Sequence, residues 1–492
     1  MRLRSTDSPL ILIVAAALAT SALALSNGAI AQGDAALAAV RRLDQASRTS
    51  NGELAPLSAE EHMRRAAIYF ANRAFAEARA HWQALITRYP NDERVPAALF
   101  GIGRSFYQER RYAEALPFFE KLGRDYPNSR EGRDGFYFVA PTLLRLGRAA
   151  EAASRYQAYI ARFPAGERIA DAYLNTIDTL REAGKPQEAL DWIERTRQKF
   201  AGTPTATNAL FAHLRLEISR GNWTKAVTLS DELLRSPLTG TMTSVAEVNY
   251  LRAYSLERLG NSAEAARIYQ LIPDSIYSYY GWLATMRLMR LGQRAQAIAR
   301  ASRVRDQIRT SADFGETPYR EIVLRVAKER GLDPRLILAI MRQESAFRPQ
   351  ARSRAAARGL MQLTIDIAQK YGPRANLSEV GEMDLYRPEI SIQIAAAYLA
   401  ELTKLFPQLP EAVVASYNGG EDNVARWLER SGKRDPGIFT AEIGFAETKD
   451  YVFKVMNYYR AYCTLYTAEL LPQRPDEAQG VNSPEKNASS IP

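Results

Sequence analysis

The first half of the chain repeats one pattern of apolar and polar positions at a step of 37 residues. An Ala-Glu-Ala triplet begins at Ala76, Ala113 and Ala150, and a looser copy begins at Gln187. Around each triplet the apolar positions lie three or four residues apart, which is the spacing of one face of a helix. A period of this length predicts stacked helical hairpins, and looser copies extend the array to about seven hairpins over residues 58–310.

Large aromatic residues mark the places where neighbouring hairpins should interlock. Trp82, Phe119 and Tyr156 occupy equivalent positions in three successive units, opposite small alanines. A small residue at the closest approach of two helices leaves room for a large side chain from the next hairpin. Such arrays are curved and commonly bind peptides on the concave face. The simpler interpretation of each aromatic residue is that it forms part of the core.

The period ends near residue 310. The segment 309–318 is polar and contains Gly and Pro, so it predicts a joint between two domains. Residues 311–471 show several helical patterns and no strand-like alternation, which predicts an all-α second domain. Residues 472–492 have almost no apolar content, and we expect them to be disordered.

The chain begins with the features of an export signal. Two arginines precede an apolar stretch from Leu10 to about Leu25, and a small-x-small sequence ends at Ala31. The stretch is short for a transmembrane helix, so we interpret residues 1–31 as a cleaved signal peptide followed by a lead segment, 32–57. An uncleaved N-terminal anchor is the alternative. No Cys lies near Ala31, so we expect a periplasmic protein with neither lipid attachment nor a membrane span after cleavage.

The charge balance leaves the class of partner open. The 492 residues carry a formal charge of +10, which favours anionic partners such as nucleic acid, acidic lipid or a carboxylate-bearing wall polymer. Export argues against nucleic acid. The arginines are also scattered along helical patterns, so an ordinary solvated surface explains the charge more simply.

The residue types available in the second domain narrow its chemistry. The only histidines, His62, His81 and His213, lie in the repeat half, so the second domain cannot contain a Ser-His-Asp relay or a His-ligated metal. The only cysteine, Cys463, cannot form an internal disulfide and has no histidine partner to activate it. Carboxylate chemistry remains, and we expect neither a metal nor a cofactor.

Glu344 is the foremost catalytic candidate. Asp333 and Pro334 predict the start of a helix, with Asp as its cap and Pro in its first turn. On this helix Ile337 and Met341 share one face with Glu344. A carboxyl group on the apolar side of a helix should have a raised pKa, as a proton donor to a glycosidic oxygen requires.

Two observations favour other interpretations of Glu344. Arg342 and Arg348 would lower the pKa of the carboxyl group if either guanidinium lay close to it. Arg342, however, lies about 160° from Glu344 around the helix. Taken alone, Glu344 could also mark an exposed helix end.

The strings that accompany Glu344 resemble those of a known enzyme family. QESAFRPQARSRAAARGLMQL begins at Gln343, ASYNGG spans 415–420 and AETKDYV spans 446–452, in that order. They resemble the successive motifs of the soluble lytic transglycosylases, which cleave bacterial peptidoglycan. The segment SYYGWLA at 278–284 and the helical array in front are similar to the large periplasmic members. The resemblance implies an all-α fold with a tetratricopeptide-like superhelix followed by a goose-type lysozyme-like catalytic domain.

The resemblance also implies roles for individual residues, with Glu344 as the sole acid and base. The implied substrate-binding residues are Ser345, Ser353, Gln362, Tyr417, Asn418, Glu447 and Tyr451. Among them, Ser353 would lie near the reacting sugar, Tyr417 would hydrogen-bond near the catalytic carboxylate, and Glu447 would orient the glycan. Gln362 would contact the glycan, and Asn418 would help to shape the cleft. Packing or helix capping is the alternative for each of these partners.

The chain departs from the family pattern at three places. Leu363-Thr364-Ile365 stands where the family often has an apolar residue, Met and Pro. Ala356 replaces a common Gly, and Gly444 replaces a common Pro. These differences bear on the contacts around Thr364 and on the sugar preference more than on the reaction.

The implied reaction cleaves the β-1,4 bond between N-acetylmuramic acid and N-acetylglucosamine and leaves a 1,6-anhydromuramoyl end. No carboxylate lies between Ser345 and Ile365, and attack by the sugar's own C6 hydroxyl makes a second protein carboxylate dispensable. The expected partners are glycan strands, stem peptides and a periplasmic protein bound to the array. A water-using lysozyme-type muramidase and a non-catalytic repeat scaffold are the alternatives.

Overall fold

The computed structural model describes residues 27–315, 317–432 and 435–473. Within these ranges helices make up the regular structure, and extended pairing is limited to isolated bridges that join Arg352 to Arg358, Arg358 to Leu363 and Tyr466 to Pro472. The predicted all-α class is confirmed for this part of the chain. Most of the predicted signal peptide and all but the first two residues of the predicted tail lie outside the described residues.

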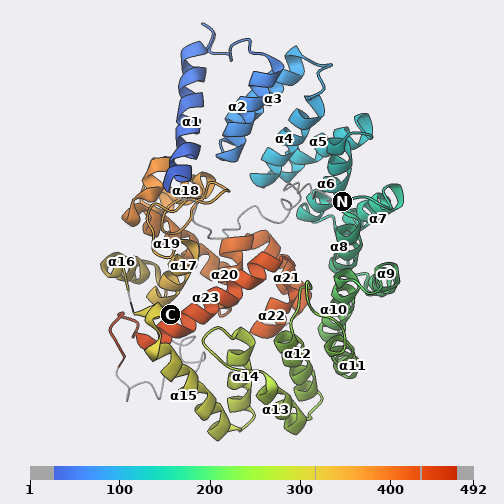
Figure 1. Ribbon diagram of the computed structural model, residues 1–492, viewed down its shortest axis with the longest axis vertical. Coiled ribbons are helices and arrows are strands. Elements are labelled where there is room, and N and C mark those ends of the chain that lie inside the picture. The colour runs from blue at the N-terminus through green and yellow to red at the C-terminus, as the bar shows by residue number, and fades with distance from the viewer. Residues whose placement is uncertain (1–26, 316, 433–434, 474–492) are drawn as a thin grey trace, which may run out of the picture.

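Helix α1 (Asn27–Ser47) precedes an array of helical hairpins that follows an arc (Figure 1). The described array has seven hairpins, the number that the repeat pattern predicts. They are α2 (Ala59–Ala71) with α3 (Phe75–Arg88), α4 (Val95–Gln108) with α5 (Tyr112–Asp125), α6 (Arg130–Arg145) with α7 (Ala149–Arg162), α8 (Ile169–Glu182) with α9 (Pro186–Lys199), α10 (Pro204–Ser219) with α11 (Trp223–Leu234), α12 (Val245–Arg258) with α13 (Ser262–Leu271), and α14 (Tyr279–Arg290) with α15 (Arg294–Thr310).

The repeated positions form the core of the array. Ala78 and Ala115, at equivalent positions one step apart, are fully buried. Trp82, Phe119 and Tyr156 are also buried, and they belong to one apolar cluster that extends from α1 to α8. The simpler interpretation of these aromatic residues is therefore correct, because their rings hold neighbouring hairpins together and are not available to a peptide.

The C-terminal part of the chain forms a second group of helices, which follows a short 3-10 helix, η1 (Ala312–Phe314), in the sequence. Its elements are α16 (Arg320–Arg330), α17 (Pro334–Ser345), α18 (Ile365–Tyr371), η2 (Pro373–Ala375), η3 (Glu382–Tyr386), α19 (Pro388–Leu405), α20 (Pro410–Gly419), α21 (Glu421–Ser431), α22 (Pro436–Glu442) and α23 (Ala446–Leu465). None of the described helices is both long and apolar enough to cross a membrane.

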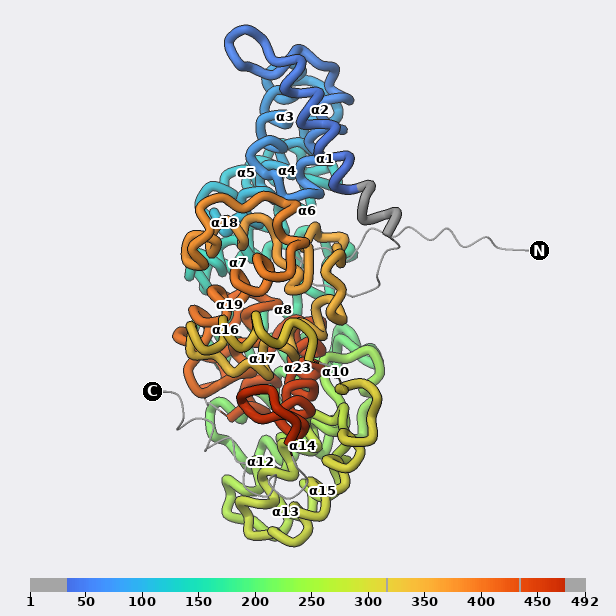
Figure 2. Tube along the Cα trace, turned by 90° about the vertical axis from the view of Figure 1, so that its left-hand side faces the viewer, coloured from blue at the N-terminus to red at the C-terminus, as the bar shows by residue number. Residues whose placement is uncertain are grey.

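The C-terminal helices occupy the hollow of the arc (Figures 1 and 2). Helix α21 packs against α8 and α10, α22 packs against α12, and α23 packs against α14 and α15. Buried ion pairs reinforce these contacts: Glu442 accepts from Arg181 at 2.5 Å and from Arg215 at 3.0 Å. The concave side of the later hairpins is thus covered by the chain's own C-terminal helices.

The buried apolar core runs across the predicted joint near residue 310. One cluster extends from Leu210 in α10 to Leu470, and it includes side chains of the last hairpins and of the whole C-terminal part. A separate cluster extends from Leu37 to Ala172. The later hairpins therefore share a core with the helices that carry the candidate site, and the domain boundaries stay a prediction.

Candidate active site

Glu344 lies at the C-terminal end of α17, on the buried side of the helix. The N-terminus of α17 is capped as predicted, because Oδ1 of Asp333 accepts a hydrogen bond of 2.9 Å from the backbone N–H of Arg335. Ile337 and Met341 are buried, and the Glu344 side chain is only 5% exposed. Glu344 is therefore no exposed helix end.

A sharp change of chain direction follows Glu344. Ala346 and Phe347 both have positive φ angles, 48° and 63°, in the left-handed region that non-glycine residues rarely adopt. Two such residues in succession end α17 directly after Ser345. The strain is the kind that accumulates at functional sites.

The arginine next to Glu344 is directed elsewhere. The Arg342 guanidinium lies over the ring of Phe314, 4.8 Å from the ring centroid, and over Tyr458 at 5.2 Å. It also donates a hydrogen bond to the backbone carbonyl of Asp313. Arg348 donates to the carbonyl of Ser345 at 3.0 Å. The predicted angular separation of Arg342 from Glu344 agrees with this placement.

Tyr451 binds the candidate carboxyl group directly. Its hydroxyl donates a hydrogen bond of 2.6 Å to Oε1 of Glu344. Burial raises the pKa of the Tyr451 phenol well above its usual value, and the nearby Glu344 charge raises it further. The hydroxyl therefore stays protonated and remains a donor over the whole physiological range.

Helix α20 brings two further predicted residues to the site. Burial and the Glu344 charge raise the pKa of Tyr417 well above its usual value. The Tyr417 hydroxyl donates to the carbonyl of Met361 at 2.8 Å, and Oδ1 of Asn418 accepts from Oγ1 of Thr448 at 2.7 Å. The α20 segment thus joins the loop before α18 to the start of α23. Thr448 was not predicted, although it lies inside the AETKDYV string.

The loop that connects α17 to α18 carries Ser353 and Gln362. The Ser353 hydroxyl accepts from the backbone N–H of Ala357 at 3.1 Å. Gln362 has a positive φ of 46°, and its amide nitrogen donates to the carbonyls of Ala351 and Gly359 at 3.0 and 2.8 Å. Both side chains brace the loop itself, so the predicted glycan contacts would use their remaining polar atoms.

Ser345 and Glu447 lie in opposite environments. Ser345 is fully buried and its hydroxyl donates to the carbonyl of Met341 at 3.2 Å, a geometry that favours packing over contact with a glycan. Glu447 is exposed in the first turn of α23, one helical turn before Tyr451. Partial burial raises the pKa of Glu447, and the negative charge of Asp450 adds to this effect. An accessible carboxyl group near Tyr451 suits the predicted role in orienting a glycan.

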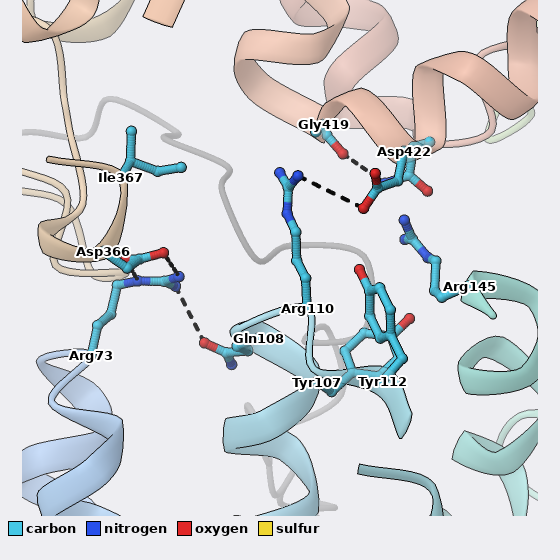
Figure 3. Close-up of a pocket in the computed structure, with 12 residues that line it drawn as sticks. Arg73, Tyr107, Gln108, Arg110, Tyr112, Arg145, Asp366, Ile367, Gly419 and Asp422 are labelled. Carbon is cyan, nitrogen blue, oxygen red and sulfur yellow. Dashed lines mark hydrogen bonds and ion pairs between the residues drawn. The ribbon is translucent and has the colours of Figure 1, made fainter. Parts of the chain in front are cut away.

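A cavity lies between the first hairpins and the helices α18, α20 and α21 (Figure 3). Its walls include Gly419 and Gly420, which directly follow Asn418, and arginines that extend from the hairpins toward them. Arg73 binds both carboxylate oxygens of Asp366, at 2.6 and 2.8 Å. Arg110 forms an ion pair of 2.5 Å with Glu421 at the start of α21. The hairpins therefore contact α18 and α21 on either side of this cavity.

Comparison with known protein families agrees with this architecture. Residues 321–439 match the transglycosylase SLT domain, and residues 64–130 and 140–204 match tetratricopeptide repeats. Residues 321–439, which include Glu344, are thus similar to the SLT transglycosylase domain. The predicted order, a tetratricopeptide-like superhelix followed by a lysozyme-like catalytic domain, fits both matches.

Individual relatives carry names of the same class. One relative is a Haemophilus influenzae protein that carries the provisional name of soluble lytic murein transglycosylase. It is 41% identical to this chain over 133 residues, which is 27% of this chain and 22% of that protein. A soluble lytic murein transglycosylase of Salmonella typhimurium is 32% identical over 142 residues, 28% of this chain and 22% of the relative. This chain therefore spans less than a quarter of the length of each of these two relatives.

One solved structure aligns over most of the chain. An inactive mutant of the lytic transglycosylase Slt from Pseudomonas aeruginosa aligns with 88% of this chain and 80% of its own, with a TM-score of 0.46 and 21% sequence identity.

Proposed function

We propose that the protein is a peptidoglycan lytic transglycosylase that cleaves the β-1,4 bond between N-acetylmuramic acid and N-acetylglucosamine and forms a 1,6-anhydromuramoyl end. One observation carries the proposal: Glu344, within the SLT-matched residues 321–439, is buried at the end of α17 and is held by the Tyr451 hydroxyl. This is one positioned carboxyl group in an apolar setting, as a reaction with a single acid and base requires.

The proposed reaction uses Glu344 twice. The protonated carboxyl group first donates its proton to the glycosidic oxygen, and positive charge develops at the anomeric carbon of the muramoyl residue. The carboxylate then removes the proton of the C6 hydroxyl, whose oxygen bonds to C1. The glycosidic C–O bond is replaced by the new C1–O6 bond, so no water is consumed and Glu344 ends protonated again. The hydrogen bond from Tyr451 holds the carboxyl group in one orientation through both steps.

The pairing of Asp366 with Arg73 fits this reaction better than the double displacement of retaining glycosidases, which need a free second carboxylate about 5 to 5.5 Å from the first. Asp366 is the first carboxylate after Glu344 in the sequence, and it is bound by Arg73 at both oxygens. We assign Glu447, Gln362, Ser353 and Asn418 to glycan binding, and Glu344 alone to proton transfer.

We also propose that the protein acts in the periplasm after cleavage of residues 1–31, in cell-wall turnover or remodelling. The sequence of the leader supports export. Peptidoglycan is the proposed substrate. The array is the proposed surface for stem peptides or a periplasmic protein partner, on the parts that the C-terminal helices leave uncovered.

The product of the reaction separates this proposal from its alternatives. Purified sacculi would be incubated with the mature protein in heavy-oxygen water, and the released fragments analysed by mass spectrometry. A transglycosylase gives anhydro ends, one water lighter than reducing ends and without the heavy oxygen. Labelled reducing ends would instead support a muramidase. Bound glycan without released fragments would support a scaffold.

A further inference from the structure

The N-terminal helix reaches the loop that carries the predicted glycan-binding residues. Asp34, in the second turn of α1, lies against Arg358 of that loop. Oδ1 of Asp34 accepts from Nη2 of Arg358 at 2.6 Å and from Nε at 3.1 Å. Arg358 is completely buried, and its remaining contact is a hydrogen bond of 2.7 Å from Nη1 to the carbonyl of Ala356.

The second carboxylate oxygen of Asp34 binds another element of the C-terminal part, η3. Oδ2 of Asp34 accepts a hydrogen bond of 2.7 Å from the hydroxyl of Tyr386 at the end of η3. Seven residues further along α1, Arg41 forms an ion pair of 2.9 Å with Glu382 at the start of η3. Helix α1 therefore holds the loop and η3 together from outside the C-terminal domain.

The first hairpin adds to this contact. Arg352, in the same loop, donates from Nη2 to Oδ1 of Asn72 at 2.7 Å and from Nε to Asp34 at 3.3 Å. A Cβ at Gly33 would lie 2.6 Å from Nη2 of Arg352, so glycine lets α1 approach the arginine closely. The loop is thus bound by both α1 and the turn that follows α2.

The part of the loop that α1 contacts is connected by hydrogen bonds to Tyr417, which lies near Glu344. The backbone N–H of Arg358 donates to the carbonyl of Leu363 at 2.9 Å, and the reverse bond measures 3.1 Å. This pair of bonds encloses Met361 and Gln362. The Met361 carbonyl accepts the Tyr417 hydroxyl bond described above, and the Tyr417 phenol lies in the field of Glu344.

A carboxylate is the group that this position requires. A fully buried guanidinium is costly unless a charge and well-aligned hydrogen bonds compensate it, and removal of one partner of such a pair is strongly unfavourable. Burial by itself would raise the pKa of Asp34, but the hydrogen bonds from Arg358 and Tyr386 outweigh it and the pKa is lowered. Asp34 is therefore ionised at neutral pH.

We infer that Asp34 is a positioning residue for the proposed transglycosylase reaction: through Arg358 it sets the conformation of the loop 351–363, and through that loop the place of the glycan relative to Glu344. The inference rests on the proposed function. It gives the part of α1 that remains after the proposed cleavage at Ala31 a role in catalysis, more than 300 positions along the sequence from Glu344.

The test uses the mature full-length chain with Asp34→Asn, which keeps the shape of the side chain and removes its charge. Cleavage of soluble glycan strands should show a kcat about tenfold lower or more, because small displacements of a substrate-positioning element are costly, with KM changed less than kcat. Arg42→Gln, at an exposed position on the same helix, is the matched control. Asp34→Glu restores the charge and should recover part of the lost rate.

Hydrogen exchange separates positioning from plain stability. In Asp34→Asn, amide exchange should accelerate in the peptide that covers residues 351–363, at a temperature where circular dichroism shows full folding. A kcat within twofold of the parent, or unchanged exchange in this loop, overturns the inference. If Asp34→Asn lacks a cooperative unfolding transition, Tyr386→Phe removes only the bond to Oδ2 and is judged by the same two criteria.

Failure of this inference is distinguishable from failure of the proposed function. An inert Glu344→Gln together with a fully active Asp34→Asn would overturn only the positioning role. An active Glu344→Gln would overturn the proposed function itself.

Discussion

The hydroxyl of Tyr451 in α23 donates a hydrogen bond of 2.6 Å to the carboxyl group of Glu344 in α17, and the two residues are 107 positions apart in the sequence. Both side chains are buried, 3% and 5% exposed. A buried hydroxyl that stays protonated can stabilise the carboxylate while it is charged and yet cannot replace it as the base. In the proposed reaction Glu344 therefore transfers the proton, and Tyr451 fixes the orientation of its carboxyl group.

Replacement of Tyr451 by Phe removes this bond and leaves the ring in place. We expect kcat on soluble glycan strands to fall by about 10- to 100-fold, because a hydrogen bond to a charged group contributes about 1.5 to 3 kcal/mol. Tyr458→Phe is the control on the same helix, since the Tyr458 ring contacts Arg342 and lies away from this bond. Equal rates for the two variants would show that the Tyr451 bond has no catalytic importance.

Glu411 should make the stability of the protein depend on pH. It is buried in α20, where its Oε1 accepts from the Tyr279 hydroxyl at 3.2 Å. Burial raises the pKa of Glu411 to about 7, above the value of about 4.3 in an unfolded chain. The native state then holds this proton more tightly than the unfolded state, so the contribution of Glu411 is fully present below about pH 4 and is lost as the pH rises through 7.

The variant Glu411→Gln removes this pH dependence. Relative to the parent, its free energy of unfolding should increase by about 3 kcal/mol between pH 4 and pH 8, which is the shift in pKa expressed as energy. Urea unfolding at both pH values measures the change. A difference between variant and parent that is the same at both pH values would contradict the prediction.

Glu442 should hold the C-terminal helices in the arc. It is 2% exposed and is bound by Arg181 and Arg215 of the array. Glu442→Gln removes one of the two carboxylates that balance these buried arginines, the other being Asp178, and should lower the free energy of unfolding by up to about 3–5 kcal/mol. Glu151→Gln breaks the exposed pair with Arg148 and should change the free energy of unfolding far less, because solvent screens that pair.

Urea unfolding of both variants tests this comparison. Burial by itself would raise the pKa of Glu442, but the surrounding arginines outweigh it and lower the pKa. The stabilising effect of Glu442 is therefore present at neutral pH and is lost as the pH falls through its lowered pKa. A Glu442→Gln variant that is no less stable than Glu151→Gln would contradict the prediction.

The features that sequence alone could predict are the ones that local spacing encodes. The 37-residue step placed Ala78 and Ala115 in the core because a helix repeats its buried positions regularly. Asp333 and Pro334 placed the start of α17 because helix caps are local signals. The same reasoning placed Glu344 on the buried face of that helix and directed Arg342 away from it.

The features that sequence could not predict depend on contacts between distant segments. The pair of Asp34 with Arg358 joins positions 324 residues apart, and neither residue belongs to a periodic pattern. The burial of Ser345 follows from the way α17 packs, which a motif does not specify. The sharing of one apolar core by the last hairpins and the C-terminal helices was likewise invisible, because helical periodicity shows which face is buried and not against what.

The central claim is that Glu344 is the only proton carrier of the reaction. Its most direct test is mass spectrometry of the fragments that the mature protein and its Glu344→Gln variant release from purified sacculi, with binding of glycan strands measured in parallel. We predict anhydromuramoyl ends from the parent and none above background from the variant, which should still be folded and bind glycan. Release of anhydromuramoyl ends by Glu344→Gln at a rate comparable to that of the parent would contradict the claim.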